Sequence, residues 1–242
     1  MKNITSRVMQ TYDEIGLAFS ATRPRLAPEV ISLLPTLPPK AQVLDLGCGN
    51  GVLLTAFDRR SLLDHRSLGE VGGEGGPIDY TGIDISPVMI KEATGLHPVA
   101  KFVLADISDQ AAWRQLGQYD FIAALAVFHH LPRRADHLAL LSQIKNHLQP
   151  GGSALISVWN LNRPKFDRYR CGKCLSIPFH PARNASSIAD AAGGGPKRFF
   201  YAFTEDELSK LAKQAGFSDI KTKIVKDNYY LVLKTPVQNR AG

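Results

Sequence analysis

The chain has 242 residues, of which 44% are hydrophobic and 21% are charged, an ordinary composition for one globular domain. No apolar run approaches the roughly 18 residues that a membrane-spanning helix requires, so we expect no membrane partner. The formal net charge of +7 permits a polyanionic partner but does not demand one.

The N-terminus and the cysteines indicate the compartment. Residues 1–5 lead into a polar, amphipathic stretch that lacks the apolar core of a signal peptide. The three cysteines, Cys48, Cys171 and Cys174, are too few for a disulfide framework and suit a reducing environment. We therefore expect a cytoplasmic protein.

Five short apolar runs alternate with helical patterns along the first two thirds of the chain. The runs are 43–46, 80–85, 100–104, 121–125 and 153–159. The helical patterns lie near 51–60, 87–95, 109–116 and 135–148. Such alternation predicts a doubly wound α/β fold, in which helices cover both faces of a mostly parallel sheet.

The C-terminal part changes this pattern. Residues 204–207 form a capping box, Thr-Glu-Asp-Glu, that opens a helix ending near Ala215. Two strand-like runs follow, 220–226 and 229–235, and their tight link at Asp227 and Asn228 predicts a hairpin. We therefore expect a seven-stranded sheet that ends in an antiparallel hairpin, within a single domain that spans residues 1–242.

Two segments interrupt the alternation. The stretch 61–78 contains five glycines and is interpreted as a flexible insert. The stretch 160–198 shows no periodicity and follows the fifth run, so we expect a substrate lid over the carboxyl edge of the sheet. Between 163 and 198 it holds eight basic and two acidic residues, and it faces either solvent or a nucleic acid.

The strongest local pattern is 43–51, Val-Leu-Asp-Leu-Gly-Cys-Gly-Asn-Gly, an apolar strand, an acid and a glycine-rich turn into a helix. Glycines let the backbone turn tightly and approach a ligand closely. The spacing differs from the Gly-x-Gly-x-x-Gly fingerprint of nucleotide dehydrogenases, and Asp45 would repel a pyrophosphate. A ligand that carries an ammonium group fits better, although the turn could also be purely structural.

Two further acids, Asp84 and Asp106, end the second and third runs. At such positions Asp84 can accept both hydroxyls of a ribose, and Asp106 can accept from an adenine amine. Either carboxylate could instead cap the following helix, although Ser86 offers another cap for the segment at Pro87. Three acids that end three successive parallel strands indicate a ligand site more specifically together than any one of them does.

This pattern resembles the S-adenosylmethionine (SAM)-binding motifs of class I methyltransferases over about residues 41–160. The resemblance implies a Rossmann-like methyltransferase fold with SAM as the cofactor. It also implies which part of the cofactor each residue of the pattern contacts. The assignments are Asp45, Gly47 and Gly49 at the methionine moiety, Asp84 at the ribose with Ile85 beside it, Asp106 and Ile107 at the adenine, and Leu125 in the pocket wall.

A second resemblance runs through nearly the whole chain, to the tRNA wobble-uridine carboxymethyl methyltransferases. The matching segments are 12–15, 19–23, 126–131 with Arg133 and Arg134, 156–159, 198–203, 205–208 and 227–230. That family esterifies a carboxylate on the wobble uridine, and its eukaryotic members work with a small zinc-containing activator subunit. The resemblance therefore implies tRNA as a partner, and such an activator as a second one.

The implied chemistry needs positioning rather than a strong base, because a carboxylate is already an anionic nucleophile at neutral pH. Cationic side chains hold a carboxylate well, so Arg23, His129 and Arg198 are the candidate catalytic residues. Each has an ordinary alternative: Arg23 pairing with a helix, His129 or His130 buried and satisfied, Arg198 as surface charge. Tyr12 could cover the methionine end of the cofactor, or only pack an N-terminal helix.

Other functions remain open. The chain lacks Asn/Asp-Pro-Pro-Tyr/Phe and Pro-Cys motifs after the fourth run, which argues against amino-nitrogen and cytosine methylation, and we expect no DNA partner. Alternatives to the tRNA reaction are a small-molecule O-methyltransferase and a SAM-binding regulator without turnover. The pair Cys171 and Cys174 with His180 nearby could begin a zinc site, but a fourth ligand is not evident, so we expect no metal.

Overall fold

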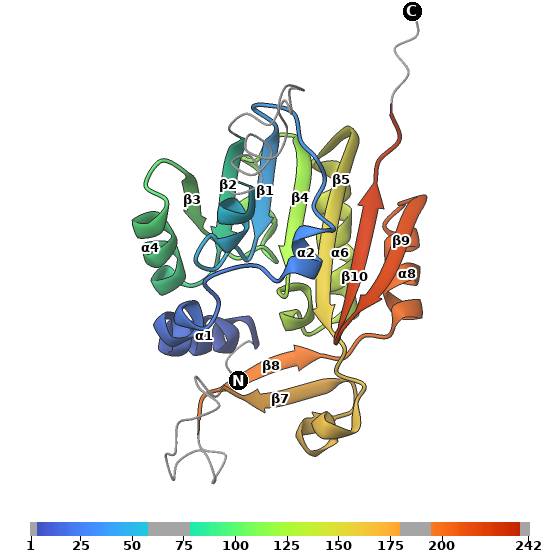
Figure 1. Ribbon diagram of the computed structural model, residues 1–242. Helices are drawn as coiled ribbons and strands as arrows, with labels where there is room; N and C mark the ends of the chain where they lie inside the picture. Colours follow the sequence, from blue (N-terminus) through green and yellow to red (C-terminus); the bar gives the residue numbers. More distant parts are fainter. Residues whose placement is uncertain (1–3, 58–77, 180–194, 238–242) are drawn as a thin grey trace, which may run out of the picture.

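The computed structural model describes residues 4–57, 78–179 and 195–237 of the chain. Its centre is a seven-stranded sheet in the order β3-β2-β1-β4-β5-β10-β9 (Figure 1). The five parallel strands are β1 (Gln42–Leu46), β2 (Asp79–Asp84), β3 (Lys101–Leu104), β4 (Tyr119–Leu125) and β5 (Leu148–Trp159). The hairpin of β9 (Asp219–Val225) and β10 (Asn228–Lys234) pairs antiparallel to β5, which confirms the expected fold class.

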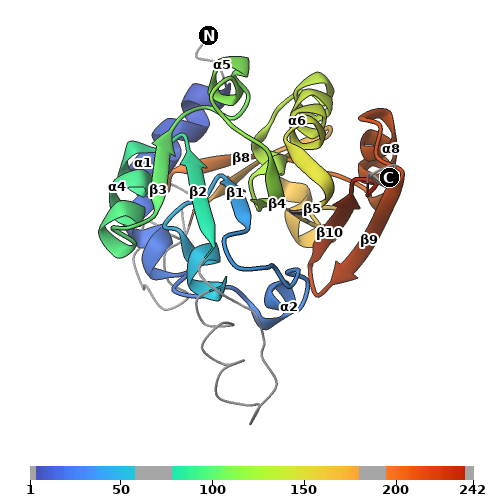
Figure 2. The same cartoon turned by 90° about the horizontal axis from the view of Figure 1, so that it is seen from above.

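Helices cover both faces of this sheet. They are α1 (Ile4–Ala21), α2 (Pro28–Ile31), α4 (Pro87–Leu96), α5 (Gln110–Trp113), α6 (Arg134–Asn146) and α8 (Glu205–Gln214), and residues 52–57 are also helical. Seen from above, α5, α6 and α8 lie on one face, and α2 and residues 52–57 lie on the other (Figure 2). Of the helices described, none has the length and apolar character needed to cross a membrane.

The sequence explains why the central strands form the core. Val43, Leu44 and Leu46 of β1 are fully buried, as are Ile122 and Ala123 of β4. Because both faces are covered, these strands carry continuous apolar runs rather than an alternating pattern. Two apolar clusters result, one on each side of the sheet.

The helices begin where their sequences predict. Ser86 caps α4 by accepting from the Met89 N–H, and Thr204 caps α8 by accepting from the Glu207 N–H. Asp109 caps α5 by accepting from the Ala111 N–H. Neither Asp84 nor Asp106 is therefore needed as a helix cap.

The structure corrects the expectation of an irregular segment at 160–198. The described part contains a 3-10 helix, η2 (Pro164–Tyr169), and the strands β6 (Arg170–Cys171) and β7 (Cys174–Pro178). With β8 (Lys197–Tyr201) these strands form a second, antiparallel sheet in the order β6-β7-β8. Figure 1 shows β7 and β8 below the carboxyl ends of the parallel strands, beside α1. Apart from Ile78, the expected insert at 61–78 lies outside the described residues.

Candidate functional site

A cavity of about 340 Å³ opens at the carboxyl edge of the parallel strands. This volume lies within the roughly 300–1,000 Å³ that is typical of small-molecule sites. All nine residues expected to contact the cofactor line it: Tyr12, Asp45, Gly47, Gly49, Asp84, Ile85, Asp106, Ile107 and Leu125. Five elements that are far apart in the sequence therefore meet here, namely α1 and the ends of β1, β2, β3 and β4.

The glycine-rich turn after β1 forms the floor of this cavity. Gly47 has φ +68°, a left-handed conformation that side chains rarely adopt, and its N–H donates to the Ile83 carbonyl at 2.7 Å. A β-carbon at Gly47 would lie 2.5 Å from Cγ2 of Val127, which lines the same cavity. The turn thus needs glycine here for its backbone conformation and for the close approach of the loop after β4.

Asp45 is a buried carboxylate at the end of β1. Its side chain is 3% exposed, and its Oδ2 accepts a hydrogen bond of 2.7 Å from the Tyr80 hydroxyl. Burial raises the pKa of Asp45 to about 7, against the lowering effect of the Tyr80 hydrogen bond and with a smaller contribution from the nearby Asp84 charge. A cationic ligand group beside Asp45 would stabilise the ionised form, which fits an ammonium group.

Asp84 is held rigidly at the end of β2. Its Oδ2 accepts from the Gly49 N–H at 2.9 Å, and its Oδ1 accepts from the Ser86 N–H at 2.9 Å. Burial raises its pKa, while these backbone N–H groups oppose the shift. Each oxygen keeps a further lone pair, so the carboxylate can still accept hydroxyl donors from a ligand.

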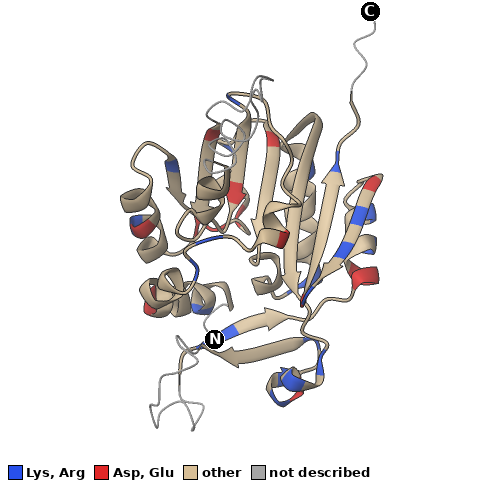
Figure 3. Cartoon of the chain, in the orientation of Figure 1, with Lys and Arg blue, Asp and Glu red and all other residues tan. Residues whose placement is uncertain are grey.

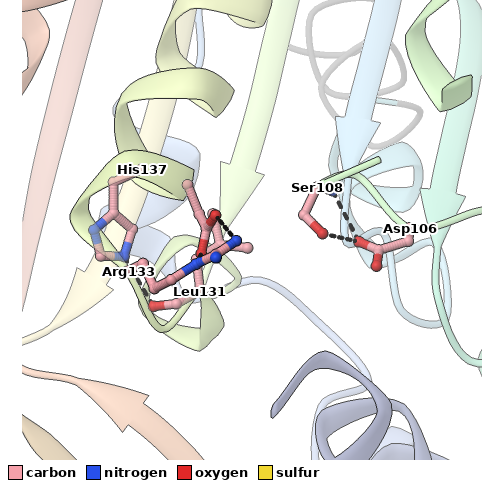
Figure 4. Close-up of polar contacts among 6 residues, drawn as sticks. Asp106, Ser108, Leu131, Arg133 and His137 are labelled. Atoms are coloured by element: carbon pink, nitrogen blue, oxygen red, sulfur yellow. Dashed lines mark hydrogen bonds and ion pairs between the residues drawn. The ribbon is translucent and has the colours of Figure 1, made fainter. Parts of the chain in front are cut away.

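Asp106 is fixed by a local turn after β3. Its Oδ1 accepts from both the backbone N–H and the hydroxyl of Ser108, at 2.8 and 2.7 Å (Figure 4). The carboxylate therefore stays at the cavity edge with acceptor capacity for an amine. Figure 4 also shows a His137 contact to the Leu131 carbonyl, where Leu131 is another wall residue.

The loop after β4 supplies a histidine that sequence reasoning did not choose. His130 lines the cavity, its Nδ1 is 2.6 Å from the Phe199 carbonyl, and its Nε2 is 2.9 Å from the Tyr12 hydroxyl. Burial lowers the pKa of His130 to about 4, so the ring is neutral at neutral pH. Because a carbonyl only accepts, Nδ1 carries the proton, and Tyr12 donates to Nε2.

His129 lies behind the wall of the cavity rather than among its lining residues. It is 1% exposed, and its Nδ1 accepts from the Trp159 N–H at 3.3 Å. Burial lowers its pKa well below the ordinary value, so it carries no positive charge for an anion at neutral pH. Among the described residues His130 rather than His129 lines the cavity, and the catalytic role expected of His129 stays a prediction.

The two arginines gather around Tyr12. Arg198 is 7% exposed and, like His129, is not among the lining residues, but its guanidinium lies 5.3 Å from the ring of Trp159, which lines the cavity. Arg23 itself lines the cavity and stacks over Phe19 at 3.9 Å. Burial raises the pKa of Tyr12, and the charges of Arg198 and Arg23 oppose that shift.

Within the described part of the chain, neither Arg23 nor Arg198 has a carboxylate partner. Moreover, the buried Nε of Arg198 has no hydrogen-bond partner there. Burial lowers the pKa of Arg23, with a smaller effect from the like charge of Arg198. Two partly desolvated cations without an anion are the arrangement that an anionic ligand would complete.

Other cavity residues lie in the matching segments 126–131, 156–159 and 227–230, to which sequence reasoning assigned no site role. Ala126 has φ +57°, unusual for a residue other than glycine, and its N–H donates to the Ser157 hydroxyl at 3.0 Å. Ser157, Asn228 and Tyr230 complete the wall from β5 and β10. Their contribution depends on strand pairing, which no local motif predicts.

Cys171 and Cys174 lie opposite each other at the tip of the β6–β7 hairpin, away from the cavity lining. Both are free thiols. Among the residues that the structure describes, no group of three or more histidine, cysteine or acidic side chains could hold a metal ion. His180 lies outside the described residues.

Comparison with known proteins gives two curated relatives with the same activity in their names. The chain is 25% identical over 239 residues to a tRNA (carboxymethyluridine(34)-5-O)-methyltransferase of Schizosaccharomyces pombe, covering 93% of this chain and 94% of the relative. It is 30% identical over 156 residues to the enzyme of that name from Saccharomyces cerevisiae, covering 64% of this chain. The match spans only 49% of that second relative.

A solved structure shares the fold. A chain from the complex of the Haloferax volcanii Trm112 methyltransferase activator with a methyltransferase superposes with a TM-score of 0.61 at 17% identity. The superposition covers 96% of this chain and 99% of the other. A family model described as a methyltransferase domain matches residues 19–222. The chain with this sheet order and this acid-lined cavity therefore belongs to the methyltransferase domain family.

Proposed function

We propose that this protein is a SAM-dependent methyltransferase that esterifies the carboxymethyl group of a tRNA wobble uridine. The observation that carries the proposal is a pair of cations without a carboxylate partner among the described residues, Arg23 and Arg198, near a cavity that Asp45 also lines. One part of the site suits a ligand ammonium, and the other suits a substrate carboxylate. The S. pombe relative, similar over almost its full length, is named for this reaction.

The donor set fits SAM residue by residue. Asp45 would hold the amino group of its methionine moiety, and Asp84 would accept the ribose hydroxyls. Asp106 would accept the adenine amine, with Ile85, Ile107 and Leu125 as apolar wall beside the Gly47 and Gly49 backbone. When bound, SAM would supply a sulfonium methyl group to a carboxylate oxygen, with the neutral thioether as the leaving group.

The contribution of this chain is orientation and the exclusion of water. Arg198 is held among the rings of Trp159, Phe179 and Phe200, each 5.2–5.3 Å away, so its guanidinium has little freedom to move. A fixed cation can hold a carboxylate in line with the methyl group, and such positioning supplies most of the acceleration. No general base is required, which agrees with the two neutral histidines in this region.

A partner subunit is part of the proposal. The structural relative from Haloferax volcanii was solved with a Trm112 methyltransferase activator. In this chain β3 is an edge strand of the large sheet, and Leu104 at its end is 54% exposed. An activator that pairs with this edge would cover an apolar surface next to Asp106 and Ile107. The cytoplasmic location expected from the sequence is also proposed, supported by three free cysteines.

A small-molecule O-methyltransferase is the second candidate. Leu26, Val30 and Leu53 give the cavity an apolar side, which could bind the ring of a small carboxylic acid or phenol. The same two arginines would favour an acid over a phenol. The choice between the candidates therefore depends on which carboxylate the protein accepts.

The deciding experiment supplies methyl-labelled SAM, carboxymethylated tRNA and a candidate activator subunit to the purified protein. We expect label in tRNA that mild alkali releases as volatile methanol, because only a carboxyl ester hydrolyses in this way. Arg198→Gln is expected to raise the KM for tRNA without changing SAM affinity, and Arg198→Lys to retain part of the activity. Alkali-stable label would move the acceptor to a base or ribose, and absence of label would favour the small-molecule candidate.

A further inference from the structure

A basic surface lies next to the cavity, and none of the proposed site residues belongs to it. Tyr230 of β10 lines the cavity, and it pairs directly with Lys223 of β9. Directly opposed residues of antiparallel strands project from the same face of the sheet, about 5 Å apart. Lys221 lies two residues further along on that same face, opposite Val232. Both lysines are exposed.

The other face of β9 is occupied by α8. The Thr222 hydroxyl donates to the Glu205 carboxylate, so the residues that alternate with the two lysines point toward this helix. Lys221 and Lys223 consequently face solvent on the cavity side of the sheet. In the described part of the chain they form no ion pair.

The 3-10 helix η2 continues this basic surface. Arg163 forms an ion pair with Asp227 in the β9–β10 turn, and Lys165 approaches the same carboxylate at 3.8 Å. These contacts fix η2 next to Asn228, which lines the cavity. Figure 3 shows basic positions on η2 and along β9, in the same view as Figure 1.

The cations of η2 lie over aromatic rings that are partly buried against the apolar cluster of the small sheet. Lys165 lies 4.9 Å from the ring of Phe166, and Arg168 lies 4.7 Å from the ring of Tyr169. Arg168 has no acidic partner among the described residues. The four exposed cations Lys165, Arg168, Lys221 and Lys223 therefore form a basic surface near the cavity, which suits the phosphate backbone of RNA.

We infer that Lys221 and Lys223 of β9, with Lys165 and Arg168 of η2, bind the phosphate backbone of the RNA that flanks the target nucleotide. This inference rests on the proposed function, because it assigns the substrate of that site to RNA. The flanking strand lies along β9 and η2, and the target nucleotide enters the cavity past Tyr230 and Asn228. Such backbone contacts position the substrate without reading its sequence.

The test uses the full-length protein, bulk tRNA and two charge-reversal pairs, Lys221→Glu with Lys223→Glu and Lys165→Glu with Arg168→Glu. We expect each pair to weaken tRNA binding by about tenfold or more at low salt. The slope of log affinity against log salt should fall by roughly 0.7–0.9 for each lost phosphate contact. SAM affinity should stay unchanged, and Lys221→Arg with Lys223→Arg should bind tRNA like the original protein.

A matched control separates a local contact from total charge. Arg114→Glu with Lys213→Glu makes the same change in net charge on the α5 and α8 side of the sheet, where both residues are exposed. We expect this pair to bind tRNA nearly normally. Equal weakening by the control pair would overturn the inference.

Failure of the inference and failure of the proposed function give different results. If the unchanged protein methylates tRNA and the charge-reversal pairs retain its KM, the surface assignment is wrong and the reaction stands. If the unchanged protein neither binds nor methylates tRNA, the surface assignment and the proposed function are both wrong. In that case, a labelled small carboxylic acid would identify the alternative reaction.

Discussion

Asp45 combines two demands that oppose each other, burial in the core and a negative charge for the ligand. Its pKa is raised to about 7, so near neutral pH only part of the free protein carries the charge. An ammonium group binds the ionised form. We therefore expect SAM affinity to rise with pH and to be roughly tenfold weaker at pH 6 than at pH 8, since each pH unit below the pKa is a factor of about ten.

Calorimetry at several pH values, in buffers of different ionisation enthalpy, measures this linkage. At pH 6, SAM binding should release nearly one proton from Asp45. Asp45→Asn should bind SAM weakly at every pH, with no slope of affinity against pH. Asp106→Asn should keep that slope, because Asp106 is proposed to contact the adenine end of the cofactor rather than its ammonium group. A slope that survives in Asp45→Asn would assign the titration to another group.

The same burial affects the stability of the free protein. Because the folded-state pKa of Asp45 lies above the ordinary value of 3.8, its contribution to stability is full below that value and is lost as pH rises through about 7. Asp45→Asn keeps an acceptor for Tyr80 and removes the buried charge. At pH 8 it should stabilise the free protein by at most about 4 kcal/mol, and by much less at pH 5, as urea unfolding at both pH values would show.

Gly47 allows a second test at a single position. An alanine there must adopt φ +68° and would overlap Val127, so Gly47→Ala should lower stability by about 1–3 kcal/mol and weaken SAM binding. The matched control is Gly95→Ala in α4, where a β-carbon meets no atom within 4 Å. Because alanine favours a helix, the control should be neutral or stabilising. Thermal melting and SAM titration of both variants measure the difference.

The choice between His129 and His130 shows what a local motif cannot decide. Both residues lie in the single 3-10 turn η1 (Phe128–His130), and both are buried. The Phe199 carbonyl, on a strand about seventy residues later, fixes the ring of His130 beside Tyr12. The orientation therefore depends on a nonlocal strand, whereas the three acids and the glycine turn follow from local strand ends.

At the scale of elements, the sequence predicted the large sheet but not the small one. The strands β1, β2 and β4 are predictable because they are buried on both faces, which requires apolar runs. By contrast β6 has two residues, and β7 must pair with β8 across residues 180–194, which the structure does not describe. Such short strands are stabilised by distant partners, so their local pattern is weak.

The helix α8 connects the two sheets and allows a prediction at this scale. Its cap is the Thr204 hydroxyl, which accepts from the Glu207 N–H at 3.2 Å, and the Glu207 carboxylate accepts from Tyr201 of β8 and Lys173 of the β6–β7 hairpin. Thr204→Ala should cost about 1 kcal/mol and lower the Tm by roughly 2–4 °C. Thr204→Asp should restore the stability, and unchanged melting of Thr204→Ala would show that the cap contributes nothing.

The whole molecule is expected to unfold as one unit, because the small sheet takes part in the candidate site rather than forming an appendage. Arg198 and Phe200 of β8 pack on Trp159 of β5, and β8 also fixes His130. Near-ultraviolet and far-ultraviolet circular dichroism should therefore give one coincident thermal transition. Saturating SAM, at about one hundred times its Kd, should add about 2.7 kcal/mol and raise that transition by roughly 5–10 °C. Two separate transitions, of which SAM shifts only one, would mean that the small sheet unfolds as an independent unit. Arg198 would then contribute to the site only after the small sheet docks on the large one.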